Sequence, residues 1–422
     1  MFPSDQAIPR SLPMMDALVD QHKGSRAPFE DTTLVLIQHQ LGSMVPMTEA
    51  FIRLGADPRR LHWIDIPYTA NTAVQAALVD LGVPRENFAP SHYHLEMPYA
   101  RYQRTRVQQM VIKLRDTLAN PGDRVLVIDD GSYFLEALSC FANPTTGISI
   151  VEQTTRGIIK INADQALRHY CEQVTIKNVA ESAPKKGIEG PLIGQAVCFS
   201  LAVSLAGRFV GARRPRCLVL GFGQIGRSVA ESLATEHGFP PESVHVADPS
   251  AEAQAAAVAR GYKVWDRGAR ERQRFGLVIG CSGSTSFGIG DRVFLEDGAI
   301  LASASSGSAE LSREAFIELA DTHAADDIYV YDRDTLPTRP IHSDIRLRLV
   351  DRDAVFLNGG FPVNFDGAVN CVPPRFIQAT HALQVGAAIE AVSIEEKGLV
   401  ALTPGLCDWV AARYRELVIG TA

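Results

Sequence analysis

The feature that most constrains this chain is the segment Gly221-Phe222-Gly223-Gln224-Ile225-Gly226, which follows an apolar strand-like run (217–220) and precedes a helical pattern (227–235). A strand, a glycine-rich turn and a helix in this order form a phosphate-binding turn for a dinucleotide. Gly221 permits the tight turn, Gly223 lets the backbone approach a pyrophosphate, and Gly226 lets the helix pack on the strand. The segment therefore predicts a bound dinucleotide at the start of the helix.

Asp248 ends the next expected strand (244–247), where a carboxylate can accept both ribose hydroxyls and repel a 2′-phosphate. NAD is therefore expected rather than NADP. The spacing from Gly223 exceeds the usual ~20 residues, and we attribute the excess to a loop at 237–241. Ser282 follows a third strand, where small residues leave room for the cofactor's other half, although a bare turn would look the same.

Composition narrows the class of protein. The 422 residues are too many for one ordinary core and predict two or three folded units. A net charge of -7 argues against nucleic acid as a partner. We expect no apolar run long enough to span a membrane. Seven dispersed cysteines without a Cys-x-x-Cys pair indicate reduced thiols, no zinc site and a cytoplasmic protein.

Apolar runs that alternate with helical periodicity indicate an α/β protein with parallel sheets covered on both faces. We expect two doubly wound parallel-sheet domains, with a Rossmann NAD-binding domain (206–364) inserted into a discontinuous substrate domain (1–205, with 365–395 crossing back). A tail helix is expected over 396–422, and the charged region 337–353 is expected to be a loop. The other expected strands are 33–37, 61–66, 124–128, 148–151, 277–279, 299–302 and 354–357, and the other expected helices are 46–54, 73–78, 104–118 and 376–392.

Polar side chains at strand ends are the candidates for chemistry on an alcohol. His39 follows the first strand, and Asp129 and Asp130 end another before Gly131, although caps and turns use the same residue types. The segment 152–157 is a dense polar cluster that turn formation would explain equally well. Lys185, Lys186 and Glu189 lie in an expected loop before an apolar helix.

A metal site is not expected. His92, His94 and Glu96 alternate as in a strand, but without a further ligand they make a weak metal site.

Together these stretches resemble the S-adenosylhomocysteine hydrolase family from about Leu34 to Val392. The similarity rests on the order and spacing of several short motifs. These are His39 ahead of Leu54-Gly55-Ala56, Asp129-Asp130-Gly131, Glu152-Gln153-Thr154-Thr155-Arg156-Gly157, Lys185 with Glu189, the glycine segment with Asp248, and Pro362-Val363-Asn364.

The resemblance implies a mechanism in which bound NAD oxidises the 3′-hydroxyl of a nucleoside-type substrate, so that the C4′ proton becomes removable and a group at C5′ is exchanged. By the same resemblance, Lys185 and Glu189 would handle the 3′-hydroxyl and C4′ protons, while His39 and Asp130 would serve the C5′ group and water. Thr154, Thr155 and Asn364 would contact the nicotinamide half of NAD. The family also implies a homo-oligomer.

The chain departs from the family pattern mainly at substrate positions. Gln153 stands where the family has a second glutamate, and Glu189 where it has an aspartate. Ser306 replaces a histidine of the family. The family's C-terminal lysine–tyrosine tail is not reproduced, since Tyr414 lies in an expected helix. We place Gln153 and Ser306 at the substrate but in altered roles.

The expected function is NAD-dependent redox at a nucleoside ribose, with S-adenosylhomocysteine as the default substrate. One alternative is a biosynthetic relative that exchanges a different C5′ group through the same keto intermediate. Another is a non-catalytic homologue that senses NAD or nucleosides. Retention of His39, Asp130 and Lys185 argues against complete loss of the active site, whereas Gln153 and Ser306 argue for some change.

Overall fold

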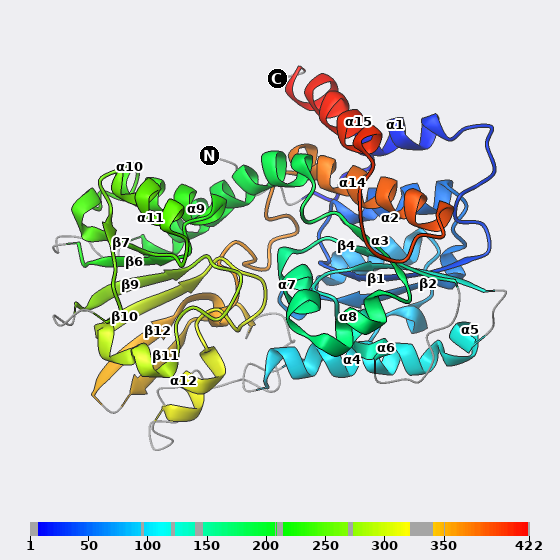
Figure 1. Cartoon of the computed structure of the whole chain (residues 1–422). Coiled ribbons are helices and arrows are strands. Elements are labelled where there is room, and N and C mark those ends of the chain that lie inside the picture. The colour runs from blue at the N-terminus through cyan, green and yellow to red at the C-terminus, as the bar shows by residue number, and fades with distance from the viewer. Residues whose placement is uncertain are drawn as a thin grey trace. The chain divides into compact units, whose positions relative to one another are not determined.

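The computed structural model describes residues 7–93, 97–119, 123–139, 147–206, 208, 214–268, 273–320, 341–349 and 351–420 (Figure 1). They form two compact units. The terminal unit comprises Pro3–His92, Arg101–Glu189 and Ala368–Ala422, and the central unit comprises Tyr93–Ala100 and Gly190–Gly367. The division falls at 190 and 367, where the sequence suggested 206 and 364, and the tail after 395 groups with the terminal unit.

The terminal unit is built on a six-stranded sheet of order β13-β5-β4-β3-β1-β2, in which every pair is parallel. Its strands are β1 (Thr32–Gln38), β2 (Leu61–Asp65), β3 (Arg124–Asp129), β4 (Ile148–Glu152), β5 (Thr175–Asn178) and β13 (Gly398–Ala401). The chain adds β2 on one side of β1 and all later strands on the other. The order therefore reverses between β1 and β3, and ligands of such sheets bind at the carboxyl ends beside this reversal.

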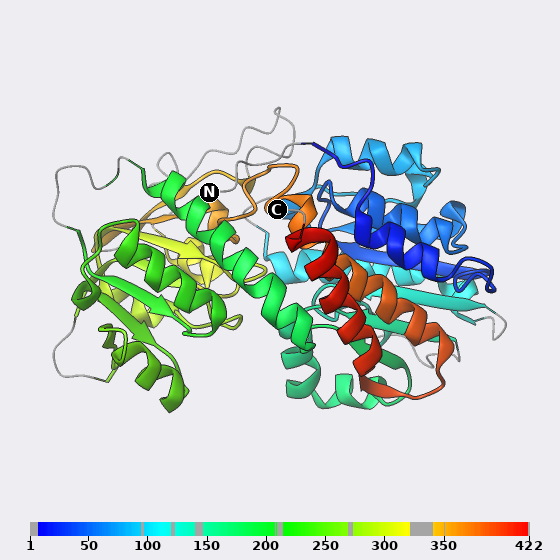
Figure 2. The ribbon, with the colours of Figure 1, turned by 90° about the horizontal axis from the view of Figure 1, so that it is seen from above.

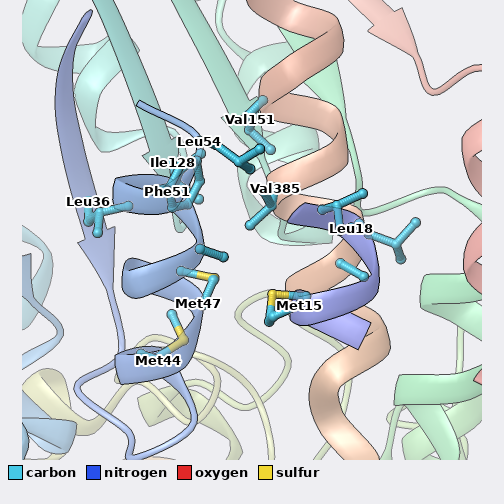
Figure 3. Close-up of a cluster of buried hydrophobic side chains, with 14 of the residues drawn as sticks. Met15, Leu18, Leu36, Met44, Met47, Phe51, Leu54, Ile128, Val151 and Val385 are labelled. Atoms are coloured by element: carbon cyan, nitrogen blue, oxygen red, sulfur yellow. The ribbon is translucent and has the colours of Figure 1, made fainter. Parts of the chain in front are cut away.

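Helices cover both faces of this sheet (Figure 1). They are α1 (Pro13–Gln21), α2 (Met44–Arg53), α3 (Thr72–Asp80), α4 (Tyr99–Lys113), α5 (Arg115–Ala119), α6 (Tyr133–Leu138), α7 (Thr155–Ala163), α8 (Gln165–Cys171), α14 (Pro374–Ser393) and α15 (Pro404–Tyr414). Figure 3 shows side chains of α1, α2 and α14 meeting those of β1, β3 and β4 in one buried cluster. Figures 1 and 2 agree that α14 and α15 lie side by side.

The central unit is built on a seven-stranded sheet of order β11-β12-β10-β9-β6-β7-β8. Its strands are β6 (Cys217–Leu220), β7 (Val244–Ala247), β8 (Lys263–Val264), β9 (Phe275–Gly280), β10 (Leu295–Ser303), β11 (Ile345–Leu349) and β12 (Arg352–Phe356). Its helices are α9 (Gly190–Leu205), α10 (Gln224–Thr235), α11 (Ala251–Val258) and α12 (Arg313–Leu319). The order reverses between β6 and β9, directly beside the glycine segment.

This second sheet is mixed, so the expectation of two fully parallel sheets is wrong. β11 pairs antiparallel with β12, from Ile345 opposite Phe356 to Leu349 opposite Arg352. We expected a loop there because of its charge, but the described residues 345–349 alternate between buried aliphatic and exposed arginine side chains. That period of two is typical of an edge strand with one solvent-exposed face.

Lys185–Leu205 was expected to begin as a loop, yet it is helical throughout, with a π-helical turn at Lys185–Glu189 before α9. By length and composition alone this stretch would pass for a membrane span, with a mean hydropathy of 1.5, contrary to our expectation that no run reaches that length. One face of α9 packs on α10, where a Cβ on Gly194 would lie 2.7 Å from Ser228 Oγ. A helix buried in a protein core can be as apolar as a membrane span, so the hydropathy of this stretch alone does not identify one.

Candidate functional site

The turn after β6 requires glycine at two of its three glycine positions. Gly221 has a φ of +90°, and a Cβ there would lie 2.8 Å from Ser282 Cα. A Cβ on Gly226 would lie 1.9 Å from Gly221 O. These two glycines therefore let α10 start against β6 and the β9 loop, which is a requirement of the fold itself.

Gly223 is different, because nothing in the described fold requires it. Its φ of -69° suits any residue, and a Cβ there would have no atom within 4 Å. It is the N-cap of α10 and offers no side-chain cap to the first-turn N–H groups. Open space over an uncapped helix N-terminus leaves its N–H groups accessible to an anion such as a phosphate.

The next two residues leave that space clear. The Gln224 side chain is turned toward α9, where a Cβ on Gly190 would lie 2.1 Å from its Oε1. Ile225 packs against the core of the central unit. Both therefore present backbone, rather than side chain, at the start of α10.

Asp248 is held beside this turn. Its Oδ2 accepts from Phe222 N at 2.7 Å and its Oδ1 accepts from Ser250 N at 2.8 Å. The side chain is half-buried at the end of β7. These two bonds fix a carboxylate beside the glycine turn.

A buried carboxylate that the sequence did not single out organises the loops after β9 and β10. Glu310 Oε1 accepts from Ser282 Oγ at 2.8 Å, and its Oε2 accepts from Gly283 N at 2.9 Å. Ser286 Oγ also donates to Glu310. Ser282 thus serves the loop itself, while Ser306 follows β10 and is half-buried. A glutamate in a serine-rich stretch gives no sequence signal for this role.

Asn364 lies at the same sheet edge, because Val363 N donates to Ser303 O at 2.9 Å at the end of β10. Asn364 is buried, and neither Oδ1 nor Nδ2 of its amide has a partner among the described residues. Buried polar groups are nearly always paired. The orphaned amide, the open space at Gly223 and the fixed Asp248 all fit a dinucleotide that carries a carboxamide.

In the terminal unit, His39 and Asp130 meet at the carboxyl ends of β1 and β3. His39 Nε2 lies 3.4 Å from Asp130 Oδ2, and His39 Nδ1 lies 3.2 Å from Thr69 Oγ1. Burial would raise the pKa of Asp130, but the His39 charge and hydrogen bond, helped by Gln153 and Lys185, bring it below its usual value. The carboxyl is therefore an anion beside an imidazole.

Gln153 completes this cluster from the end of β4. Its Nε2 donates to Asp130 Oδ2 at 2.6 Å and to Gln38 Oε1 at 3.0 Å. Gln38 is buried at the end of β1, and its own Nε2 has no partner among the described residues. A neutral amide at position 153 thus supports the Asp130 anion, which a carboxylate there would repel.

Asp129 and Glu152 beneath this cluster are structural. Asp129 accepts from Tyr133 N and Phe134 N, which caps α6, whereas its neighbour Asp130 faces His39. Glu152 accepts from Ser132 N at 2.7 Å and from both the N–H and the hydroxyl of Thr154 at 2.7 Å. Burial and the Glu152 charge raise the pKa of Asp129 well above its usual value.

The two threonines expected at the nicotinamide, Thr154 and Thr155, differ in their hydrogen bonds and exposure. Thr154 Oγ1 donates to Glu152 and accepts from Gly157 N at 2.9 Å, so its hydroxyl is used as the N-cap of α7. Thr155 is the first residue of that helix and is exposed.

Lys185 and Glu189 face each other along the π-helical turn, with Nζ and Oε2 2.5 Å apart. Thr380 Oγ1 of α14 donates to the same carboxylate. The Lys185 charge also lowers the pKa of Asp130, so the ion pair and the His39–Asp130 pair share one neighbourhood. Five of the expected residues (His39, Asp130, Gln153, Lys185, Glu189) thus gather in the terminal unit.

The weak metal candidate is only partly described, because His94 and Glu96 lie outside the described residues. Among the residues that the structure does describe, no group of three histidine, cysteine or acidic side chains could hold a metal ion.

The chain is thus an α/β protein with polar side chains gathered at the carboxyl ends of two sheets. No family model matches it. It is similar to two proteins of Mycobacterium tuberculosis, one from each of two strains and both described as uncharacterized, with 27% identity over 369 residues. The aligned region covers 86% of this chain and 64% of each relative, so the chain spans less than two thirds of their length.

Proposed function

We propose that this protein is an NAD-dependent enzyme that acts on a nucleoside-type substrate, in the manner of the S-adenosylhomocysteine hydrolases that it resembles. The observation that carries the proposal is the open space at Gly223, bordered by the fixed Asp248 carboxylate. The fold of the turn does not require a glycine at position 223, whereas Asp248 also accepts from Phe222 N within the turn. Both are accounted for by a bound dinucleotide with free ribose hydroxyls.

The strand order of the central unit supports this assignment. Leaving aside the antiparallel β11, the order 8-7-6-9-10-12 corresponds to the 3-2-1-4-5-6 order of dinucleotide-binding Rossmann folds, with the glycine turn at the reversal. On this proposal the central unit is a Rossmann domain inserted into a substrate domain formed by the terminal unit.

NAD would supply reversible hydride transfer at a substrate hydroxyl. The backbone at 223–226 would hold its pyrophosphate, Asp248 a ribose, and Asn364 its carboxamide. The acid at position 248 supports NAD over NADP, because its charge would repel a 2′-phosphate.

The terminal unit would supply the proton chemistry. Thr69 Oγ1 donates its own proton to Ile66 O at 2.9 Å, so it faces His39 Nδ1 as an acceptor. The ring can then hold a proton at Nε2 against the Asp130 anion and exchange it with a substrate group. Lys185, paired with Glu189, would orient a sugar hydroxyl and exchange its proton.

A changed C5′ group is a second candidate, and Gln153 favours it. The family's carboxylate at this position would accept a hydroxyl proton, whereas the Gln153 amide donates both observed bonds to protein acceptors. S-adenosylhomocysteine remains the default substrate, and a nucleoside with another C5′ substituent is the alternative.

The test has two stages. Purified protein is denatured and examined for released NAD by mass spectrometry, and the native protein is incubated with S-adenosylhomocysteine, adenosine and related nucleosides while absorbance at the NADH wavelength is followed. We expect bound NAD, NADH formation and, with S-adenosylhomocysteine, adenosine release. Protein that neither contains nor binds NAD would overturn the proposal. Bound NAD with no NADH on any nucleoside would favour a sensing role.

A further inference from the structure

Two buried polar side chains of α14, His381 and Gln384, interact with each other but leave polar atoms without a well-formed hydrogen bond. His381 is 4% exposed, and neither of its ring nitrogens has a partner among the described residues. Gln384, three residues later, is 1% exposed, and its Oε1 also lacks a partner. Their helix neighbours are satisfied: Gln378 accepts from Met14 N at 2.9 Å, and Thr380 donates to Glu189.

Orphaned polar groups that lie together on one helix point to something that binds them. Buried polar atoms almost always find a protein partner, a ligand or an ordered water. Since α14 pairs its other polar side chains in the same stretch, poor packing of the helix does not explain the exception. His381 and Gln384 are also close enough in sequence to share one helix face.

The position of these residues along α14 brings them to the candidate site. Ser149 Oγ, at the start of β4, donates to Ala391 O at 3.1 Å, and Arg124 donates to Val392 O. The C-terminal end of α14 therefore lies at the strand beginnings. His381 lies about 15 Å along α14 from Ala391, and Gln153 lies about 13 Å along β4 from Ser149. Both residues therefore reach the carboxyl-end edge of the sheet.

Electrostatics agree with this placement. The Lys185 charge acts on both His381 and Asp130, and the Glu189 charge acts on His381. Burial lowers the pKa of His381 to about 4, so the ring is neutral near pH 7. A neutral imidazole offers one N–H donor and one acceptor, and Gln384 Oε1 adds an acceptor.

We infer that His381 and Gln384 form a substrate subsite that hydrogen-bonds an uncharged hydroxyl or amide group of the molecule bound beside Lys185 and Glu189. A neutral donor–acceptor pair suits such a group, whereas a charged one would meet no compensating charge from these two side chains. The inference rests on the proposed function for the identity of the substrate. Within that function, His381 is a specificity-determining residue.

The experiment compares His381→Phe and His381→Gln with wild type, all loaded with NAD and titrated with adenosine by calorimetry. Phenylalanine fills the space of the ring without polar atoms, and glutamine restores a donor and an acceptor. The matched control is His62→Phe, since His62 on β2 is also buried, also has its pKa lowered to about 4, and also carries an unpartnered nitrogen. Thermal unfolding without ligand is measured for each variant.

We expect His381→Phe to unfold at the wild-type temperature or higher, because it removes unpaired polar atoms, and to bind adenosine at least about tenfold more weakly. His381→Gln should bind within about threefold of wild type, and His62→Phe should bind like wild type. Unchanged adenosine affinity in His381→Phe, or a lower unfolding temperature without ligand, would overturn this inference but not the proposed function. Wild-type protein that binds NAD but does not bind adenosine would instead overturn the nucleoside part of the proposed function.

Discussion

His39 Nε2 faces Asp130 Oδ2 at 3.4 Å, while its other nitrogen faces the hydroxyl oxygen of Thr69 at 3.2 Å. Both ring nitrogens thus face hydrogen-bond acceptors, and one of these acceptors is a carboxylate. The two side chains come from strands β1 and β3, on either side of the reversal in strand order. The sheet therefore places this pair where ligands of such sheets bind, and the proposed function assigns it proton transfer to the substrate.

Asp130→Asn should remove this function while leaving the cofactor site intact. We expect turnover to fall about 10²- to 10⁴-fold, the usual contribution of a positioned acid or base, with NAD content unchanged. Steady-state kinetics and mass spectrometry of released NAD check this. Full turnover in the variant would remove Asp130 from the reaction.

The effect of Asp130→Asn on the unfolding free energy should depend on pH in a defined way. The pKa of Asp130 lies below its usual value in the folded protein, so its charge stabilises the fold above about pH 3.8, and that contribution is lost as the pH falls further. The difference in unfolding free energy between wild type and Asp130→Asn should be constant at higher pH and shrink below this value. Urea titrations across the acid range measure it.

Asp129 should show the opposite trend, although it is the adjacent residue. Burial and the Glu152 charge raise its pKa, so the wild type loses stability as the pH rises from about 3.8 toward the raised value. Asp129→Asn avoids this loss, and its destabilisation relative to wild type should therefore diminish with rising pH. Denaturant unfolding at pH 5 and pH 8 decides the sign, and a larger defect at pH 8 would contradict the assignment.

Gly223→Ala separates cofactor binding from folding. The added methyl group meets no atom within 4 Å and the φ of -69° is ordinary, so the unfolding temperature should stay within about 1 °C of wild type. The same methyl group would intrude on a pyrophosphate, and NAD affinity should fall by about 100-fold or more. NAD affinity is measured by fluorescence titration.

Two other glycines supply the controls for this test. Gly405→Ala, in equally open space on α15, should change neither NAD affinity nor folding. Gly226→Ala places its Cβ 1.9 Å from Gly221 O and should destabilise the protein by about 3 kcal/mol. Wild-type NAD affinity in Gly223→Ala would mean that the turn binds no phosphate.

Asp248→Asn should change the choice of cofactor. The variant removes the charge that would repel a 2′-phosphate, while the amide oxygen can still accept one of the two backbone N–H bonds from Phe222 and Ser250. We expect the ratio of NAD to NADP affinity to drop by about tenfold, mostly through weaker NAD binding. Titrations of both cofactors at one salt concentration check this, and an unchanged ratio would contradict the role of Asp248.

Much of the fold could be predicted because contiguous apolar runs determine the central strands. The bounds of β6 and β7 agree with the sequence expectation residue for residue. β11 was missed because its exposed arginines suggested a loop, and β13 because it is a four-residue strand with alternating exposure at the sheet edge. The two-residue β8 and the interior strand β5, whose four residues include a buried lysine and asparagine, were not expected either. Edge strands depend on a neighbour that local sequence does not reveal.

In the candidate site too, some residues could be predicted from the sequence and others could not. Parallel strands bring their carboxyl ends to one edge, so His39 and Asp130 could be expected near each other. Residue types alone could not distinguish Asp130 from Asp129, and only the family resemblance pointed to Asp130. The turn after β3 decides which carboxyl caps α6. Glu310 and His381 gave no signal, because their roles depend on donors and burial contributed by distant segments.

Lys177 shows how one such distant contact secures the C-terminal segment. It is buried on β5, its Nζ lies 2.9 Å from Glu390 Oε2 of α14, and it donates to Ala401 O of β13 at 3.2 Å. Glu390 also accepts from Thr403 just after β13. One buried ion pair thus links a central strand, a helix and the last strand of the sheet.

Lys177→Met should therefore cost about 3 kcal/mol in unfolding free energy, because it leaves Glu390 without its cation. Adding Glu390→Gln should restore part of the loss, with a coupling of about 1 to 3 kcal/mol in a double-mutant cycle. The surface pair of Arg413 and Glu416 is the control, and Arg413→Met should cost less than about 1 kcal/mol. Hydrogen exchange should quicken first at the amides of β13, since these lose their anchor while the central strands keep theirs. Equal costs for the buried and surface variants would show that Lys177 contributes packing rather than charge pairing.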